Sequence, residues 1–227
     1  MLKIVNGLLN ALLVAGIAFS SGCSSGRENK NVDFMSSAIQ VNSNEEDYIG
    51  LTEKEAKEIG ISVGMKNKEL LSSVSDVDEP AILVNGIAIT NRTICYQKAM
   101  QLYPGIGTLK DNIVSIVRTK VVQSEAIKKN IEPSQKDIDA YLQEELKTFK
   151  EGTTFGLDFE VGYIEGMGIT IEEYIESRKQ MIYDMYQRNQ FWASVQPIEK
   201  NKEEYIDDLV KKAEIEILDP EIKQLFQ

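Results

Sequence analysis

The sequence predicts a mainly helical protein with a small β element, in which an N-terminal hairpin pairs with a C-terminal strand. Apolar residues recur at intervals of three, four and seven along several segments between residues 91 and 212, which is typical of amphipathic helices. Two β-prone runs flank Asn85 and Gly86, a pair that favours a tight hairpin turn. Residues 213–218 alternate polar and apolar side chains, which predicts a strand. Because a lone terminal strand needs a partner, we expect it to pair with the hairpin.

The strongest helical pattern runs from Thr170 to Trp192. Thr170 is a good N-cap, and Glu173 three residues later completes a capping box. Arg178 is the one charged residue on an otherwise apolar stripe. We expect one continuous helix whose stripe is buried by the neighbouring segments. The stripe consists of Ile171, Tyr174, Ile175, Met181, Ile182 and Met185.

The other segments of the unit from residue 79 to residue 227 follow in order. After the hairpin at Ile82–Ile89, a helix capped by Thr90 or Asn91 is expected to run to about Tyr103. A second helix is expected over Asp111–Lys129. Its apolar face consists of Ile113, Ile116, Val117, Val121 and Ile127. Asn130 can adopt the left-handed backbone conformation that follows the end of that helix. Ser134 is a good N-cap for a third helix, and Gly152 would end that helix. Residues 153–168 are glycine-rich and predict a loop or a partly helical linker. A last helix is expected over Ile198–Lys212.

Residues 47–78 predict a small helical extension or linker. Thr52 and Glu55 form a capping box for a helix that Gly60 would end, Ile61–Val63 suits a short strand, and Lys66–Val77 suits a second short helix or a linker. The run Gly50-Leu51-Thr52-Glu53, followed by Glu55-Ala56, also resembles small inhibitor-like modules of secreted bacterial proteins. A plain helical extension is the alternative.

The N-terminus predicts export. Lys3 precedes a short apolar run that is too short for a comfortable transmembrane helix but suits a signal peptide over residues 1–22. Gly22 and Cys23 resemble the end of a bacterial lipoprotein signal, although Ser20 stands where leucine is usual. The resemblance implies that Cys23 is lipidated and holds the chain at the extracytoplasmic face of the cell membrane. Ordinary secretory cleavage after Ser20 is the alternative, and residues 23–46 predict a flexible tether.

Composition excludes several classes of function. The chain has 227 residues and a net charge of −11, so it offers no basic stripe for nucleic acid. It contains no histidine, which excludes histidine-dependent catalysis and histidine-ligated zinc. Asp158 and Glu160 lack the number of ligands that a calcium loop needs. We therefore expect no metal and no cofactor.

Other catalytic patterns are weak. Three carboxylate pairs are expected on exposed helix faces, where carboxylates are usually solvated: Glu144-Glu145, Glu172-Glu173 and Asp207-Asp208. Cys95 lies beside Ile94 and is expected to be a small buried apolar residue rather than a reactive thiol. A disulfide between Cys23 and Cys95 is not expected, because Cys23 would be lipidated.

The order of these segments resembles a known family. The segments concerned are Val84-Asn85-Gly86-Ile87-Ala88-Ile89-Thr90, Ile131-Glu132-Pro133-Ser134 with Ile138 and Tyr141, Gly168–Ile182, and Lys211-Lys212-Ala213-Glu214-Ile215. Together they resemble the N-terminal chaperone domain of SurA- and PrsA-type extracytoplasmic foldases, an architecture shared with the C-terminal domain of trigger factor. The resemblance covers residues 79–218, and no single one of its motifs is specific.

The resemblance implies a membrane-anchored chaperone that binds unfolded or exported polypeptides. Family members commonly insert a parvulin prolyl isomerase domain before the last helix, and its site typically uses histidines. Here residues 196–202 connect the two helices directly and no histidine exists, so we expect no isomerase activity. The alternative function is a structural lipoprotein that binds one specific envelope partner.

A surface for unfolded clients should be apolar and adaptable, which suits methionine and aromatic side chains. The acidity of the chain favours basic or apolar clients. The candidate peptide-binding residues are Phe159, Tyr163, Met167, Tyr183, Tyr186, Phe191 and Trp192. The alternative is that most of these side chains belong to the core.

Overall fold

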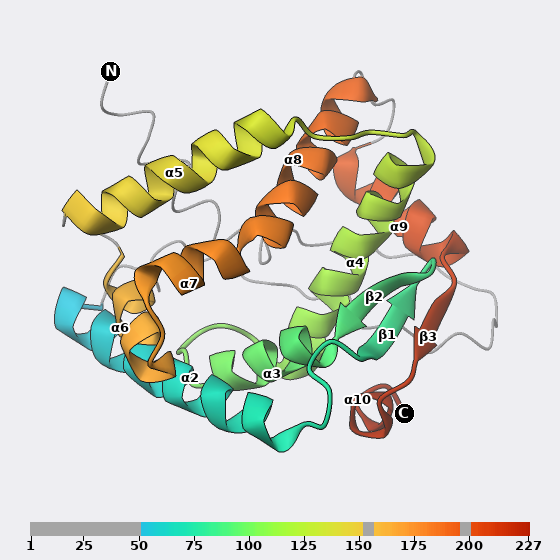
Figure 1. Ribbon diagram of the computed structural model, residues 1–227. Coiled ribbons are helices and arrows are strands. Elements are labelled where there is room, and N and C mark those ends of the chain that lie inside the picture. The colour runs from blue at the N-terminus through green and yellow to red at the C-terminus, as the bar shows by residue number, and fades with distance from the viewer. Residues whose placement is uncertain (1–50, 152–156, 196–200) are drawn as a thin grey trace.

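The computed structural model describes residues 51–151, 157–195 and 201–227. The described chain is mainly helical with one three-stranded antiparallel sheet, which confirms the predicted fold class at this level (Figure 1). The strands are β1 (Pro80–Val84), β2 (Ile87–Thr90) and β3 (Ile215–Ile217). The helices are α2 (Glu53–Ser73), α3 (Asn91–Met100), α4 (Leu109–Lys128), α5 (Gln135–Glu151), α6 (Asp158–Met167), α7 (Ile171–Ser177), α8 (Lys179–Ser194), α9 (Lys202–Lys212) and α10 (Pro220–Gln224).

The hairpin and the terminal strand pair as the sequence predicts. Asn85 and Gly86 have φ values of 50° and 80°, which are the left-handed values that a two-residue hairpin turn requires. β1 lies in the middle of the sheet, and its other edge pairs with β3 in the register Val84 opposite Ile215 and Ile82 opposite Ile217. The sheet therefore joins the two ends of the unit that begins at residue 79.

Asn85 connects this sheet to the helices. Its Nδ2 donates to Ser124 Oγ on α4 at 2.8 Å, and its Oδ1 accepts from the backbone N–H of Glu214 at 2.9 Å. Its own backbone N–H donates to the carbonyl of Glu214 at 2.8 Å. One turn residue thus holds the hairpin, α4 and the entry to β3 together.

Substitution of Asn85 should separate its conformational role from its side-chain bonds. Asn85→Gly keeps the left-handed turn and loses both bonds, and it should lower the free energy of unfolding by about 1–2 kcal/mol. Asn85→Ala loses the same two bonds and also the short polar side chain that lets asparagine tolerate a positive φ, so it should lose about 1 kcal/mol more than Asn85→Gly. Urea unfolding of both variants measures the difference. A glycine variant as stable as the parent would show that the two side-chain bonds contribute nothing.

The segment before the sheet differs from its prediction. The capping box is confirmed, since Thr52 Oγ1 accepts from the Glu55 backbone at 3.2 Å and Glu55 Oε2 accepts from the Thr52 backbone at 2.8 Å. However, Gly60 does not end the helix and residues 61–63 form no strand, because α2 continues to Ser73. Helix α2 continues past Gly60 because of a tertiary contact, in which Gly60 and Gly64 are buried against the backbone of α6.

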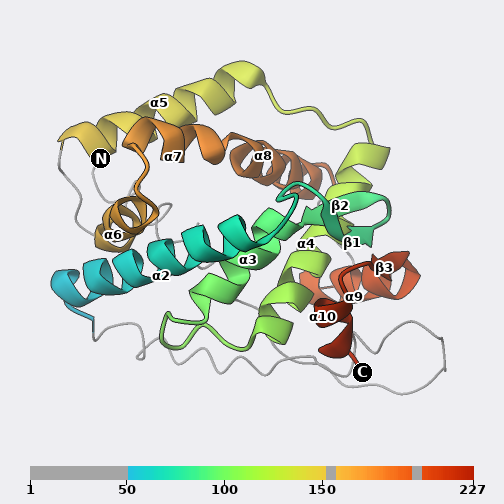
Figure 2. The same ribbon diagram turned by 60° about the horizontal axis from the view of Figure 1, so that its bottom comes forward.

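Helix α6 occupies much of the segment predicted as a loop or linker, of which residues 153–156 lie outside the described residues. Gly162 and Gly166 lie one turn apart in α6 and face Lys57 and Ile61 of α2. The two helices run parallel and side by side (Figures 1 and 2). We call the four residues Gly60, Gly64, Gly162 and Gly166 the glycine seam.

The long helix predicted from Thr170 is divided into two. Its capping box is confirmed, with Glu173 N–H donating to Thr170 Oγ1 at 3.2 Å. α7 ends at Ser177, and α8 begins at Lys179 after a bend at Arg178. The bend accompanies the burial of Arg178, whose side chain pairs with Glu145 of α5 rather than turning to solvent.

Smaller differences have local causes. α4 begins at Leu109 rather than Asp111, because Thr108 and Asp111 form a capping box, and Ile127 at its end is 48% exposed rather than packed. Asn130 adopts the predicted left-handed conformation at φ 54°. α9 begins at Lys202, whereas residues 196–200 lie outside the described residues. Helix α10 was not predicted, although Asp219 accepts from two backbone N–H groups at its start and Pro220 occupies its first turn.

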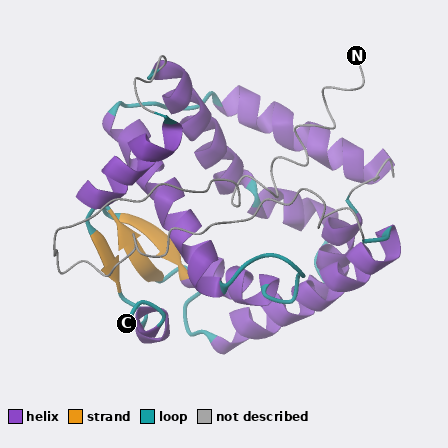
Figure 3. Ribbon diagram, turned by 180° about the vertical axis from the view of Figure 1, so that it is seen from behind, coloured by secondary structure: helices purple, strands orange, loops and turns teal. Residues whose placement is uncertain are grey.

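The core has three apolar clusters. The first lies between the sheet, α4, α9, α10 and the end of α8, and the strands occupy one end of the molecule in Figure 3. The second joins α5, α6, α7 and the start of α8, and the third joins α2, α3 and α6. Since α2 contributes Val63 to the third cluster, residues 53–73 share a core with the following unit.

Candidate functional site

The predicted peptide-binding residues do not form one surface. Phe191 is 0% exposed in the sheet cluster, and Phe159 and Tyr163 are 7% and 9% exposed in the α2–α3–α6 cluster. These three side chains belong to the core, which was the alternative interpretation, because the glycine seam brings α2 against Phe159 and Tyr163 and the sheet cluster encloses Phe191.

The other candidates are half-buried and lie on different clusters. Met167 packs against the α2–α3–α6 cluster, and Tyr183 and Tyr186 pack against the cluster of α5, α6, α7 and α8. Trp192 packs beside Tyr205 of α9 at a ring separation of 5.9 Å. The large apolar side chains that are exposed are scattered over separate elements: Leu51, Met65, Leu102, Ile127, Met181 and Leu218. Cys23 lies outside the described residues.

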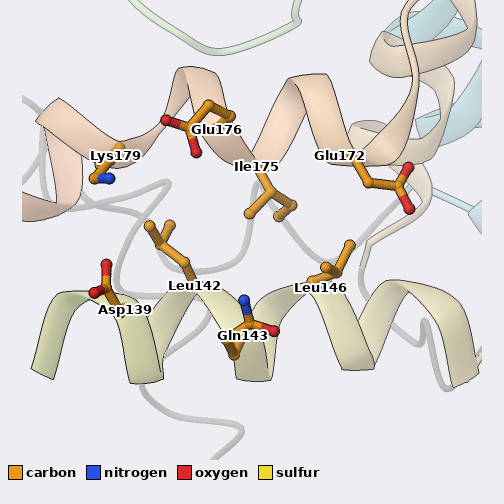
Figure 4. A pocket seen from close by; sticks show the side chains of 8 residues that line it. All are labelled: Asp139, Leu142, Gln143, Leu146, Glu172, Ile175, Glu176 and Lys179. Atoms are coloured by element: carbon orange, nitrogen blue, oxygen red, sulfur yellow. The ribbon is translucent and has the colours of Figure 1, made fainter. Parts of the chain in front are cut away.

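An open groove of about 380 Å³ lies between α5 and α7. Figure 4 shows Leu142 and Leu146 of α5 pointing toward Ile175 of α7, with polar side chains around these three. Leu146 is half-buried, whereas Leu142 and Ile175 are 7% and 6% exposed and form the deeper part. The polar side chains are Asp139, Gln143, Glu172, Glu176 and Lys179. We call this feature the α5–α7 groove.

The charges of the α5–α7 groove differ between its ends. Glu172 pairs with Lys150 at 2.7 Å, and this bond holds the pKa of Glu172 below its usual value. At the other end, Asp139 Oδ1 accepts from the Gln135 side chain at 2.7 Å. Neither Glu176 nor Lys179 makes an ion pair within the described ranges. Asp139, Glu176 and Lys179 together carry one net negative charge at that end.

A buried ion pair holds the two walls of the groove together. Arg178 donates to Glu145 Oε1 at 2.9 Å, and the two side chains are 15% and 9% exposed. The guanidinium also lies 5.4 Å from the ring centre of Tyr174, a cation–π contact. Arg178 is thus the polar partner that connects α5 to the bend between α7 and α8.

The surroundings of this ion pair perturb several pKa values. Burial raises the pKa of Glu145 despite the opposing effect of Arg178, and burial with the nearby Glu145 charge raises the pKa of Tyr141 to about 12. Burial alone would lower the pKa of Arg178, but Tyr174, Glu145, Tyr141 and Glu160 together raise it. Arg178 therefore stays charged, and the pair forms a fixed structural link.

Glu160 of α6 should make stability depend on pH. It is 6% exposed, and burial raises its pKa more than its backbone hydrogen bond and Arg178 lower it. The folded state therefore holds a proton that the unfolded chain has already released, so stability falls as pH rises from the ordinary glutamate pKa through the raised one.

Glu160→Gln removes this titration. It should be more stable than the parent at about pH 7, and the difference should shrink as pH falls toward about pH 4. Urea unfolding at both pH values tests this. Parallel pH profiles of parent and variant would contradict it.

A second polar network connects α4 and α8. Asp184 accepts from Lys120 at 2.9 Å and from Gln180 at 2.7 Å, and Lys120 also donates to Gln123 at 2.8 Å. Gln187 continues the network to the carbonyl of Ile131 at 2.8 Å. The side chains of this network hydrogen-bond to one another, so the network holds α4 against α8 rather than forming a binding site.

The carboxylate pairs are less uniform than predicted. Glu145 is buried against Arg178, and Asp207 is half-buried and paired with Arg118, so the prediction of exposed faces is wrong for these two. The predicted burial of Cys95 is confirmed at 4% exposure, and burial raises the pKa of its thiol. Sequence reasoning missed Glu145 as a partner of Arg178, although it shares a helix face with Ile138, Leu142 and Phe149.

Comparisons with protein-family models, curated proteins and solved structures found no match. Among the described residues, no helix is long and apolar enough to cross a membrane. The same residues contain no group of three or more cysteine, aspartate or glutamate side chains placed to hold a metal ion.

Proposed function

We propose that the protein is a membrane-anchored, extracytoplasmic chaperone-like lipoprotein that binds unfolded or exported polypeptides without catalysis. The observation that carries the proposal is the α5–α7 groove, an open depression in which Leu146 is half-buried above the nearly buried Leu142 and Ile175 and in which acidic side chains outnumber Lys179 at the rim. Apolar contacts of this kind recognise exposed hydrophobic segments with little dependence on sequence.

Two further observations support the proposal. The hairpin–helices–strand order that resembles SurA- and PrsA-type chaperone domains is accompanied by the pairing of β1 with β3. The direct connection at residues 196–202 leaves no room for an inserted isomerase domain, and the chain lacks histidine. Lipidation of Cys23 would hold this binding unit at the membrane surface.

A second candidate is an interaction lipoprotein that binds one specific envelope partner. The observation that favours it is the burial of Phe159, Tyr163 and Phe191, which leaves less apolar surface for varied clients than the sequence predicts. Such a protein would use the same groove for one partner of fixed sequence.

Aggregation assays separate the two candidates. The chaperone proposal expects the chain to suppress aggregation of several unrelated unfolded proteins. Absence of suppression, together with capture of one envelope protein at defined stoichiometry, would support the specific partner. The protein used in these assays should keep α2 and α10, because both contribute to the core clusters. Any acceleration of prolyl isomerisation would contradict the proposal of a protein without catalysis.

A further inference from the structure

We propose that the α5–α7 groove binds a short polypeptide segment that presents a lysine or arginine next to apolar side chains. The cation would lie at the end formed by Asp139 and Glu176, and the apolar side chains would lie over the half-buried Leu146 and the small exposed parts of Leu142 and Ile175. This inference rests on the proposed function and specifies which part of a client is bound and where.

The charge distribution selects a cation and places it. Lys150 already neutralises Glu172, so that end of the groove has no free charge to offer. The opposite end holds two carboxylates, Asp139 and Glu176, against the single ammonium of Lys179, as Figure 4 shows. An acidic segment would face the two carboxylates, and like charges in contact oppose binding. The net charge of −11 on the chain also attracts basic segments at longer range.

The size of the groove limits the segment and its affinity. From Asp139 to Leu146 the groove follows α5 for about two helical turns, or about 10 Å. A volume of about 380 Å³ is near the lower end of ligand sites, enough for a few side chains. We therefore expect weak, rapidly reversible binding, with dissociation constants of about 10 µM or higher. Such binding suits a protein that holds exported chains briefly and then releases them.

Peptide binding to the full chain tests the proposal. The probes are fluorescent peptides that combine lysine with leucine, the same peptides with glutamate for lysine, and the same peptides with serine for leucine, followed by anisotropy. We expect binding of the first set only, and weakening when salt is raised from about 0.05 to about 0.5 M. Equal binding of the glutamate set would overturn the proposal.

Variants locate the site. Glu176→Lys should weaken binding of the lysine–leucine peptides about tenfold, and Glu176→Gln about threefold. The matched control is Glu132→Lys, an equal charge change at an exposed position before α5, which should have little effect. Equal weakening by both lysine variants would mean that only net charge matters and would overturn the site.

The outcomes separate this inference from the proposed function. If the chain suppresses aggregation and Glu176→Lys does so equally well, with peptide affinity unchanged, the site is wrong and the function remains. If the lysine–leucine peptides bind in the groove but no client is protected, the site is supported and the chaperone function is wrong. If neither occurs, both are wrong.

Discussion

Substitution of Gly60 by alanine should lower the free energy of unfolding by about 2–4 kcal/mol. A Cβ at this position would lie 2.1 Å from the carbonyl oxygen of Phe159 and 2.9 Å from the backbone nitrogen of Tyr163. These are backbone atoms, so they cannot rotate away as a flexible side chain would. α2 and α6 would have to separate, which opens the cluster that contains Val63, Phe159 and Tyr163.

The sign of the change in stability distinguishes close backbone packing at Gly60 from simple helix propensity. In an exposed helix, alanine is more favourable than glycine by about 1 kcal/mol, so helix propensity alone predicts stabilisation. Gly162→Ala should behave like Gly60→Ala, because its Cβ would lie 2.1 Å from the carbonyl oxygen of Lys57. Ser62→Ala, at an exposed position of α2, is the matched control. Guanidinium unfolding measures all three, and a stabilised Gly60→Ala variant would contradict the packing of the glycine seam.

Substitution of Arg178 by methionine should lower the free energy of unfolding by about 3–5 kcal/mol, because it leaves the Glu145 carboxylate buried without its partner. The loss should shrink as pH falls, since protonation removes the unpaired charge and the pKa of Glu145 is already raised by burial. Arg178→Lys should lose less, as it keeps the charge but lacks the guanidinium geometry.

A double-mutant cycle tests this explanation. Arg178→Met combined with Glu145→Leu removes both charges and should recover most of the stability lost in Arg178→Met. Additive losses in the double variant would show that the two residues act independently. Because Glu145 and Arg178 connect the helices that form the α5–α7 groove, peptide binding should weaken in the single variant as well.

Local signals in the sequence predicted much of the fold. Asn85-Gly86 predicted the hairpin because few other residue pairs tolerate two left-handed positions, and the Thr52 and Thr170 capping boxes predicted two helix starts. Gly60 suggests a helix end because an isolated capped helix commonly stops at glycine. Its actual role depends on Gly162 and Gly166, about 100 residues away, and only the matching four-residue spacing in both segments signals this contact.

The candidate site was less predictable. Arg178 stands out as a lone charge on an apolar stripe, but its partner Glu145 adjoins the exposed Glu144, and pairs of adjacent acids are usually solvated. The aromatic residues near Phe159 and Phe191 suit either a client surface or a core, and the contacts of α2 and the sheet decide for the core. The groove itself arises from two helices meeting, which no single segment encodes.

Photo-crosslinking from the groove tests the central claim most directly. Gln143 lines the α5–α7 groove and is exposed, so a photoreactive side chain at this position can reach a bound polypeptide. Glu132, exposed before α5, serves as the control position. We expect an unfolded basic client to crosslink to position 143 and not to position 132. No crosslink at 143, or equal yields at both positions, would contradict binding of clients in the groove.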